Sequence, residues 1–110
     1  MNSVILIGRL TKDLEVKELD KEGAVARFSL AVNRGWKNAD GETEADFIDI
    51  TLWNDLAKHV AEYCKKGDLI AVKGRLQNNN YEKEDGTKVY SLTVVAEKVT
   101  FLQNKKESEA

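Results

Sequence analysis

Trp36 lies in a polar stretch, NRGWKNADGE, in which no core pattern accounts for so large an apolar side chain. The nearest pattern of alternating apolar residues ends at Val32. A tryptophan in this setting either folds back over the core as a lid or is held out as a flat surface on which another planar group can stack. The chemistry that the second alternative offers is aromatic stacking.

Two more aromatic residues occupy the polar face of a predicted strand, 45–53. The even positions of this segment form an apolar face, made of Ile48, Ile50 and Leu52. Successive side chains of a strand point to opposite sides, so Phe47 and Trp53 share the other face. Asp49 and Thr51 lie between the two rings on that face. The two rings are expected to point away from the core, unless the hairpin or a subunit contact covers them.

Tyr81 is a fourth candidate for a stacking surface. The inward positions expected for the strand that starts near Leu69 are Ile70, Val72, Gly74 and Leu76. If this strand continues without a bulge, Tyr81 shares its outward face with Lys73 and Arg75. A hairpin tyrosine taken alone often packs only against its cross-strand neighbour.

No residue pattern points to catalysis or to a metal site. His59 and Cys64 do not share a face of the predicted helix, and the chain has no other cysteine or histidine to complete a metal site. His59 is expected at the surface of the helix and Cys64 in the core. The GxSxG and GxxxxGK[ST] motifs are absent from the sequence. We expect a protein that is not an enzyme and needs no cofactor.

Length and composition limit the classes of protein further. A chain of 110 residues fits a single domain. The net charge of -2 gives no overall attraction to a polyanion, so any basic patch must be local. The apolar run Val4-Ile5-Leu6-Ile7 is too short to span a membrane. A single cysteine excludes an internal disulfide and fits a reducing cytoplasm.

The elements that would position these residues follow from apolar periodicity and turn signals. The predicted strands are 2–10, 24–32, 45–53, one from about residue 69, and 88–102. Asp40-Gly41 and Asp85-Gly86 are typical hairpin turns. A helix capped by Asn54 or Asp55 and stopped by Gly67 follows the third strand. Its expected core face consists of Leu56, Val60, Tyr63 and Cys64.

This order predicts an all-β fold, a five-stranded OB barrel with one helix between the third and fourth strands. Glycines in the similar strand segments ILIGRL and AVKGRL suggest bulges or tight bends of the barrel. Barrels of this kind bind single-stranded nucleic acid on the outward face of the second and third strands and on the adjoining loops.

Four segments of the chain resemble the bacterial and phage single-stranded DNA-binding protein family. They are NSVILIGRLTKDLEVK, AVARFSLAVNRGW, EADFIDITLWNDLAKHVAEYCKKGD and VKGRLQNNNYEKEDGTKVY, within residues 2–102. The resemblance implies a homotetrameric OB fold that binds and protects single-stranded DNA in replication, recombination and repair, without catalysis. It places the family's base-stacking aromatics on Trp36, Phe47, Trp53 and Tyr81, the same four residues that the strand pattern singled out.

Basic residues lie among these aromatics and are expected to contact phosphates. They are Arg9, Arg34, Lys37, Lys73, Arg75, Lys83 and Lys88. Each of them taken alone is more often a solvated surface charge than a phosphate contact. Acidic residues near Trp36 and Phe47 would repel phosphates and weaken binding: Asp40, Glu42, Glu44, Asp46 and Asp49.

The first strand carries apolar side chains on both faces, as in its residues Val4, Ile5, Leu6 and Ile7. A strand of this kind is usually covered on both sides. In so small a protein the second cover is expected to be another subunit, so these residues are the predicted oligomer interface.

Residues 1–103 are expected to form the DNA-binding domain, and residues 104–110 a short disordered end. The family's cellular members continue into a disordered tail with an acidic tip that recruits repair proteins. QNKKESEA lacks such a tip, so we expect no tail-mediated recruitment. We expect a cytoplasmic location in a bacterial cell, with a phage gene as a possible source. The alternatives are an OB-fold adaptor between proteins and a dimer like the primosomal replication protein.

Overall fold

The computed structural model describes residues 1–21, 23–37 and 39–104, with the backbone alone at residues 36 and 37. Its elements are β1 (Val4–Leu10), β2 (Lys17–Leu19), β3 (Gly23–Lys37), β4 (Thr43–Trp53), α1 (Asn54–Tyr63), β5 (Leu69–Asn78), β6 (Tyr81–Glu82), β7 (Lys88–Val89) and β8 (Leu92–Gln103). Apart from Asn104, the predicted end segment 104–110 lies outside the described residues.

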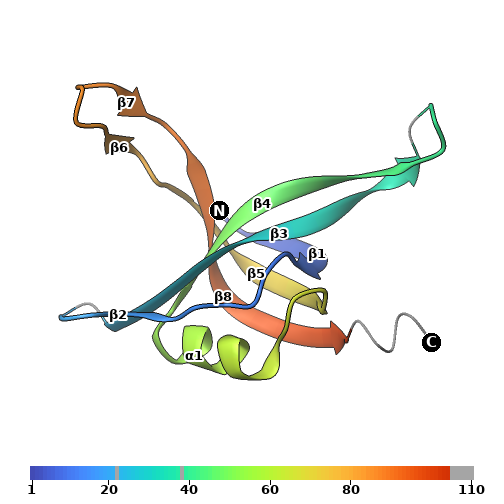
Figure 1. Ribbon diagram of the computed structural model, residues 1–110, viewed down its shortest axis with the longest axis horizontal. Coiled ribbons are helices and arrows are strands. Elements are labelled where there is room, and N and C mark those ends of the chain that lie inside the picture. The colour runs from blue at the N-terminus through green and yellow to red at the C-terminus, as the bar shows by residue number, and fades with distance from the viewer. Residues whose placement is uncertain (22, 38, 105–110) are drawn as a thin grey trace.

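The strands form the predicted barrel. They pair in the order β1-β5-β8-β4-β3-β2, and an additional β1–β3 pairing makes a partly closed ring of β1, β3, β4, β5 and β8. All of these pairings are antiparallel except β4–β8, which is parallel. The helix α1 lies between β4 and β5 in the chain and covers one end of the barrel, as Figure 1 shows. The prediction of an all-β, five-stranded OB fold is confirmed.

Two hairpins extend from the barrel in different directions, with β3–β4 at the upper right of Figure 1 and β6–β7 at the upper left. The β3 strand continues to Lys37, beyond the predicted end at Val32. Both predicted turns are present, with Gly41 at φ 80° and Gly86 at φ 87°. The Asp85 carboxylate accepts the backbone N–H of Thr87 at 2.9 Å, and this hydrogen bond lowers the pKa of Asp85.

The core lies inside the ring. Its largest fully buried side chains are Leu30, Ile50, Leu52, Val60, Ile70, Val72 and Val94. Cys64 is buried as predicted, and burial raises the pKa of its thiol. Two residues expected to face inward do not. Leu76 is 43% exposed because it lies beyond Val4, the first residue of β1, which pairs with Gly74. Tyr63 is 62% exposed and packs its ring against His59, which is itself exposed on α1.

Glycines 8 and 74 lie where strands approach closely. A Cβ at Gly8 would overlap the backbone carbonyl of Ala31, and one at Gly74 would overlap that of Val95. Gly74 also follows a register shift in the β5–β8 pairing. The predicted bulge is present at Gly74. The β1–β5 register through Gly8 has no irregularity, so this glycine marks only a close approach of strands.

The helix begins differently from the prediction. Its N-cap is Trp53, and no side-chain hydrogen bond caps it. Asn54 instead adopts φ 55°, and its Oδ1 accepts the backbone N–H of Ala24 at 3.1 Å, which ties the helix start to β3. The helix ends at Tyr63, before Gly67. Gly67 donates its N–H to the Leu10 carbonyl at 2.8 Å. Within the described residues, no helix is long and apolar enough to cross a membrane.

The predicted last strand 88–102 consists of two strands in the structure. The chain leaves β7 after Val89, and β8 starts at Leu92 in a different sheet. The β6–β7 hairpin is therefore a separate two-stranded arm of the molecule.

Candidate nucleic-acid interface

Phe47 is an exposed aromatic residue on the outer face of the barrel. It pairs with Ala31 of β3 in a register without irregularity from Val25 to Asn33, so the alternation of β4 side chains is undisturbed. Its ring is 66% exposed, while Ile50 and Leu52 on the other face are fully buried. The predicted outward orientation of Phe47 is confirmed.

Trp53 is only half-buried, at the end of β4. It pairs with Val25 of β3 and is also the residue that precedes α1. Trp53 is thus partly accessible to solvent and partly packed on the protein. Trp36 lies on β3 near the tip of the β3–β4 hairpin, and its side chain is outside the described part of the chain.

Tyr81 lies on the separate β6–β7 hairpin and is 54% exposed. The β5 strand ends at Asn78, so the continuous strand on which the shared face with Lys73 and Arg75 depended does not exist. The same hairpin carries Tyr90, which is 74% exposed and which sequence reasoning missed. Tyr81, Lys88 and Tyr90 line one small groove of about 190 Å³. The Asp85-Gly86 turn could have revealed Tyr90, since it folds residues 88–90 back beside Tyr81.

Arg34 does not project as an isolated cation. Its guanidinium donates hydrogen bonds to Asp46 at 2.8 and 3.0 Å and also contacts the carboxylate of Glu44. Hydrogen bonding to Arg34 lowers the pKa of Asp46, and the same bond raises that of Arg34. One cation therefore meets two acidic groups on the β3–β4 hairpin, which leaves this cluster with a net negative charge.

The other predicted phosphate contacts are distributed over several elements. Arg9 is half-buried, and its guanidinium donates a hydrogen bond to the Gly67 carbonyl at 2.9 Å. This bond holds the side chain against the loop after α1. Arg75 donates to the Gln77 side chain at 2.9 Å. Lys73, Lys83 and Lys88 are exposed, and the side chain of Lys37 is outside the described part of the chain. The structure thus brings Lys88 close to Tyr81 but does not gather all seven cations in one patch.

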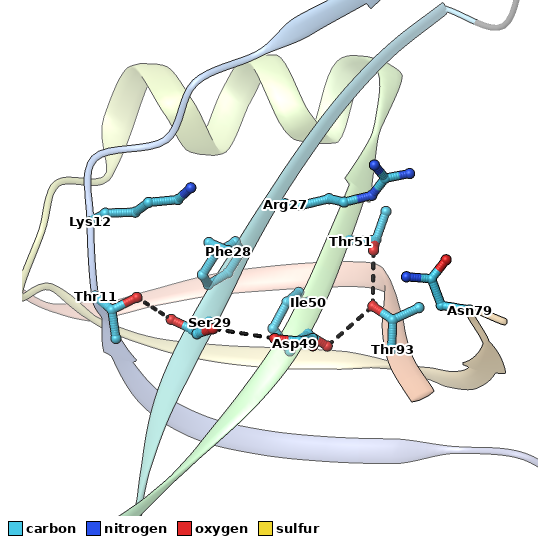
Figure 2. A pocket seen from close by; sticks show the side chains of 10 residues that line it. All are labelled: Thr11, Lys12, Arg27, Phe28, Ser29, Asp49, Ile50, Thr51, Asn79 and Thr93. Atoms are coloured by element: carbon cyan, nitrogen blue, oxygen red, sulfur yellow. Dashed lines mark hydrogen bonds between the residues drawn. The ribbon is translucent and has the colours of Figure 1, made fainter. Parts of the chain in front are cut away.

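A polar groove of about 360 Å³ includes Asp49, which follows Phe47 by two residues on β4 (Figure 2). Its lining residues are Thr11, Lys12, Arg27, Phe28, Ser29, Asp49, Ile50, Thr51, Asn79 and Thr93. Hydrogen bonds join Thr11 to Ser29, Ser29 to Asp49, Asp49 to Thr93 and Thr93 to Thr51. Thr51 shares the face of β4 that carries Phe47 and Asp49, as the alternation predicts. It is buried there, at 5% exposure, and shares a 2.9 Å hydrogen bond with Thr93.

Only one face of β1 packs into the barrel. Val4 and Leu6 are half-buried against the core, whereas Ile5 and Ile7 are 70% and 53% exposed. In a single chain, the apolar side chains of the second face of β1 are therefore exposed to solvent. Among the residues that the structure describes, no group of histidine, cysteine and acidic side chains could hold a metal ion.

Comparison with known proteins identifies the family of this chain. The model of the "Single-strand binding protein family" matches residues 1–102. The chain is 52% identical over 105 residues to single-stranded DNA-binding protein 3 of Listeria innocua, with 96% of this chain and 66% of that protein covered. It is 47% identical over 109 residues to single-stranded DNA-binding protein B of Bacillus subtilis, with 99% and 96% covered. It is 53% identical over 103 residues to the single-stranded DNA-binding protein of Bacillus cereus, of which it spans 61%.

Proposed function

The chain belongs to the single-strand binding protein family, and on this premise we propose that it binds and protects single-stranded DNA in replication, recombination and repair. The observation that carries the proposal is the family match, which spans nearly the whole described barrel. The names of the relatives are those of DNA-binding proteins and not of enzymes. The function is therefore binding without catalysis.

Base stacking is the main source of affinity in this proposal. Every base has a π face, so stacking tolerates any sequence and contributes roughly 1–3 kcal/mol per base. Phe47 supports this role because its ring is exposed on a strand whose other face is already filled by the core. Trp36, Trp53 and Tyr81 complete the proposed set, and Tyr90 joins it because it lines the same groove as Tyr81.

Phosphate contacts are the second source of affinity in this proposal. Lys73, Lys83 and Lys88 are exposed, and Arg75 donates a hydrogen bond to the side-chain amide of Gln77. Arg9, Arg34 and Lys37 remain in the proposed set. Arg34 is the weakest member because Glu44 and Asp46 already occupy its guanidinium.

The active form is proposed to be a homotetramer in the cytoplasm of a bacterial cell. The exposed isoleucines of β1 support an interface on that strand, formed by Val4, Ile5, Leu6 and Ile7. Burial of apolar side chains contributes about 25 cal/mol for each Å² removed from water, so association through this face is favourable.

The test of the proposed function is a titration of intrinsic tryptophan fluorescence with oligo-dT. Binding is expected to quench Trp36 and Trp53, and duplex DNA is expected to compete poorly because its bases are already stacked. Single Trp36→Phe and Trp53→Phe variants assign the quenching to each ring. An adaptor between proteins would give no fluorescence change and no retention of the oligonucleotide, and that result would refute the proposal.

A further inference from the structure

The polar groove of Figure 2 contains an acidic group, Asp49, that the stacking mechanism does not use. Asp49 lies two residues beyond Phe47 on the same face of β4, which is roughly 7 Å along a strand. Its side chain is exposed and lines the groove. A carboxylate this close to a stacking surface must lie close to the bound bases or to their phosphates.

Hydrogen bonds hold Asp49 in a fixed position. Its Oδ1 accepts the hydroxyl of Ser29 at 3.2 Å, and its backbone carbonyl accepts the hydroxyl of Thr93 at 3.2 Å. Thr93 is in turn bonded to Thr51 at 2.9 Å. Figure 2 shows this chain of contacts along the floor of the groove. No residue in the described part of the chain donates a hydrogen bond to Oδ2 of Asp49, and no cation there forms an ion pair with it.

Two cations line the same groove without neutralising that carboxylate. Lys12 and Arg27 are exposed, and neither forms an ion pair with any residue that the structure describes. In the view of Figure 2 both lie on the same side of the hydrogen-bonded floor. The groove therefore presents positive groups for an anion and a carboxylate for a hydrogen-bond donor. A nucleotide carries both, in its phosphate and in its base edge.

The hydrogen-bond donors on the edge of each base decide which base matches the Asp49 carboxylate. An ionised carboxylate only accepts hydrogen bonds. Guanine offers two parallel donors on its Watson–Crick edge, N1–H and the N2 amino group. Adenine and cytosine offer one amino group beside a ring nitrogen that accepts, and thymine offers one N–H between two carbonyl oxygens. Proteins read these edges in single strands, where the bases are unpaired.

We propose that this groove binds one nucleotide of the strand and prefers guanine, with Asp49 accepting from the guanine edge and Lys12 and Arg27 contacting phosphate. The inference rests on the proposed binding of single-stranded DNA. Binding then tolerates any sequence overall but favours guanine at one position of the site. A bidentate contact to a base edge supports a preference of roughly fivefold or more.

The experiment compares three oligonucleotides of equal length at one salt concentration. The first is all dT, the second has dG at every third position, and the third has inosine at those positions. Isolated guanines cannot form quadruplexes, and inosine lacks only the N2 amino group. Fluorescence anisotropy is expected to show tighter binding of the dG oligonucleotide than of dT, and inosine is expected to remove at least half of that gain. This comparison uses the unmodified protein, so its result is valid even if a variant fails to fold.

Asp49→Asn then tests the residue, since an amide offers one acceptor and one donor and no longer matches the guanine edge. The ratio of dG to dT affinity is expected to fall close to one. Asp46→Asn is the matched control, because it removes the same charge from β4 at a carboxylate engaged by Arg34. It should change affinity for all three oligonucleotides equally and leave the ratio intact.

Equal binding of dG and dT oligonucleotides by the unmodified protein would overturn this inference and leave the proposed function standing. A guanine preference that persists unchanged in Asp49→Asn would overturn it as well. Failure to bind any of the three oligonucleotides would contradict the proposed function itself, and this inference with it.

Discussion

Phe47 and Trp53 share a face of β4 but differ in what surrounds them. Phe47 is largely exposed, whereas Trp53 is half-buried where β4 meets α1. Replacing Phe47 is therefore expected to remove a proposed stacking surface with little effect on packing, while replacing Trp53 is expected to disturb both. Phe47 is the cleaner position at which to measure the contribution of stacking.

We expect Phe47→Ala to weaken binding of oligo-dT by about 1–3 kcal/mol without changing the salt dependence, because no phosphate contact is lost. The measurement is a fluorescence titration at several salt concentrations. Tyr63→Ala is the matched control, since Tyr63 is equally exposed but lies on α1. A similar loss in both variants would contradict the role of Phe47.

The cluster of Arg34, Glu44 and Asp46 gives a second prediction for single residues. Arg34→Ala should change the slope of log affinity against log salt less than Arg75→Ala, which should flatten it by about 0.7. Glu44→Gln combined with Asp46→Asn should raise affinity and steepen the slope, because it frees the guanidinium for phosphate. The measurement is binding across a salt series. An unchanged slope in the double variant would show that Arg34 does not face the DNA.

At the scale of elements, local periodicity predicted most of the barrel. The inward residues of β3 and β4 could be predicted because alternation is a property of each strand alone. Leu76 could not, because its exposure depends on where the partner strand β1 begins. The side chain of Asn2 bonds both backbone groups of Leu76 there, at 2.7 and 2.8 Å. Tyr63 was placed wrongly because α1 buries a narrower face, Ala57 and Val60.

The groove was not predictable from the sequence, since residues of distant segments form it. Thr11, Ser29, Asp49 and Thr93 come from separate segments and meet only when the ring is formed. Sequence reasoning identified Asp49 as a charge that repels phosphate and did not give it a partner. The separate β6–β7 hairpin could not be predicted for the same reason. The chain is interrupted at Tyr90 and Ser91 because β7 pairs with β6 in one sheet and β8 pairs with strands of the other sheet.

Substitution of Gly74 tests whether β5 and β8 need their close approach at this position. A methyl group there would meet backbone, which cannot move aside like a flexible side chain. Gly74→Ala should lower the free energy of unfolding by about 1–3 kcal/mol, as overpacking does. Urea denaturation measures this, with Gln77→Ala on the exposed end of β5 as the control. Equal stability of the two variants would mean that the bulge can relax.

At the scale of the whole molecule, the exposed face of β1 predicts association. We expect sedimentation equilibrium at micromolar concentration to show a homotetramer. Ile5→Lys combined with Ile7→Lys should shift it towards smaller species, because charged ammonium groups would have to be buried at the interface. Tyr63→Lys makes the same kind of change on α1 and should leave the assembly intact. A monomer in the unmodified protein would refute the predicted interface.

The parallel pairing of β4 with β8 joins Ile50 and Thr51 to Val94 and Val95, so the ring cannot close until the last strand arrives. Topologies dominated by such distant contacts fold slowly, on a scale of roughly milliseconds to seconds. The chain contains no proline, so the isomerisation step that delays many proteins by tens of seconds has no counterpart here. Stopped-flow refolding should therefore give a barrel-forming phase independent of protein concentration, and any slower phase should accelerate with concentration as subunits assemble.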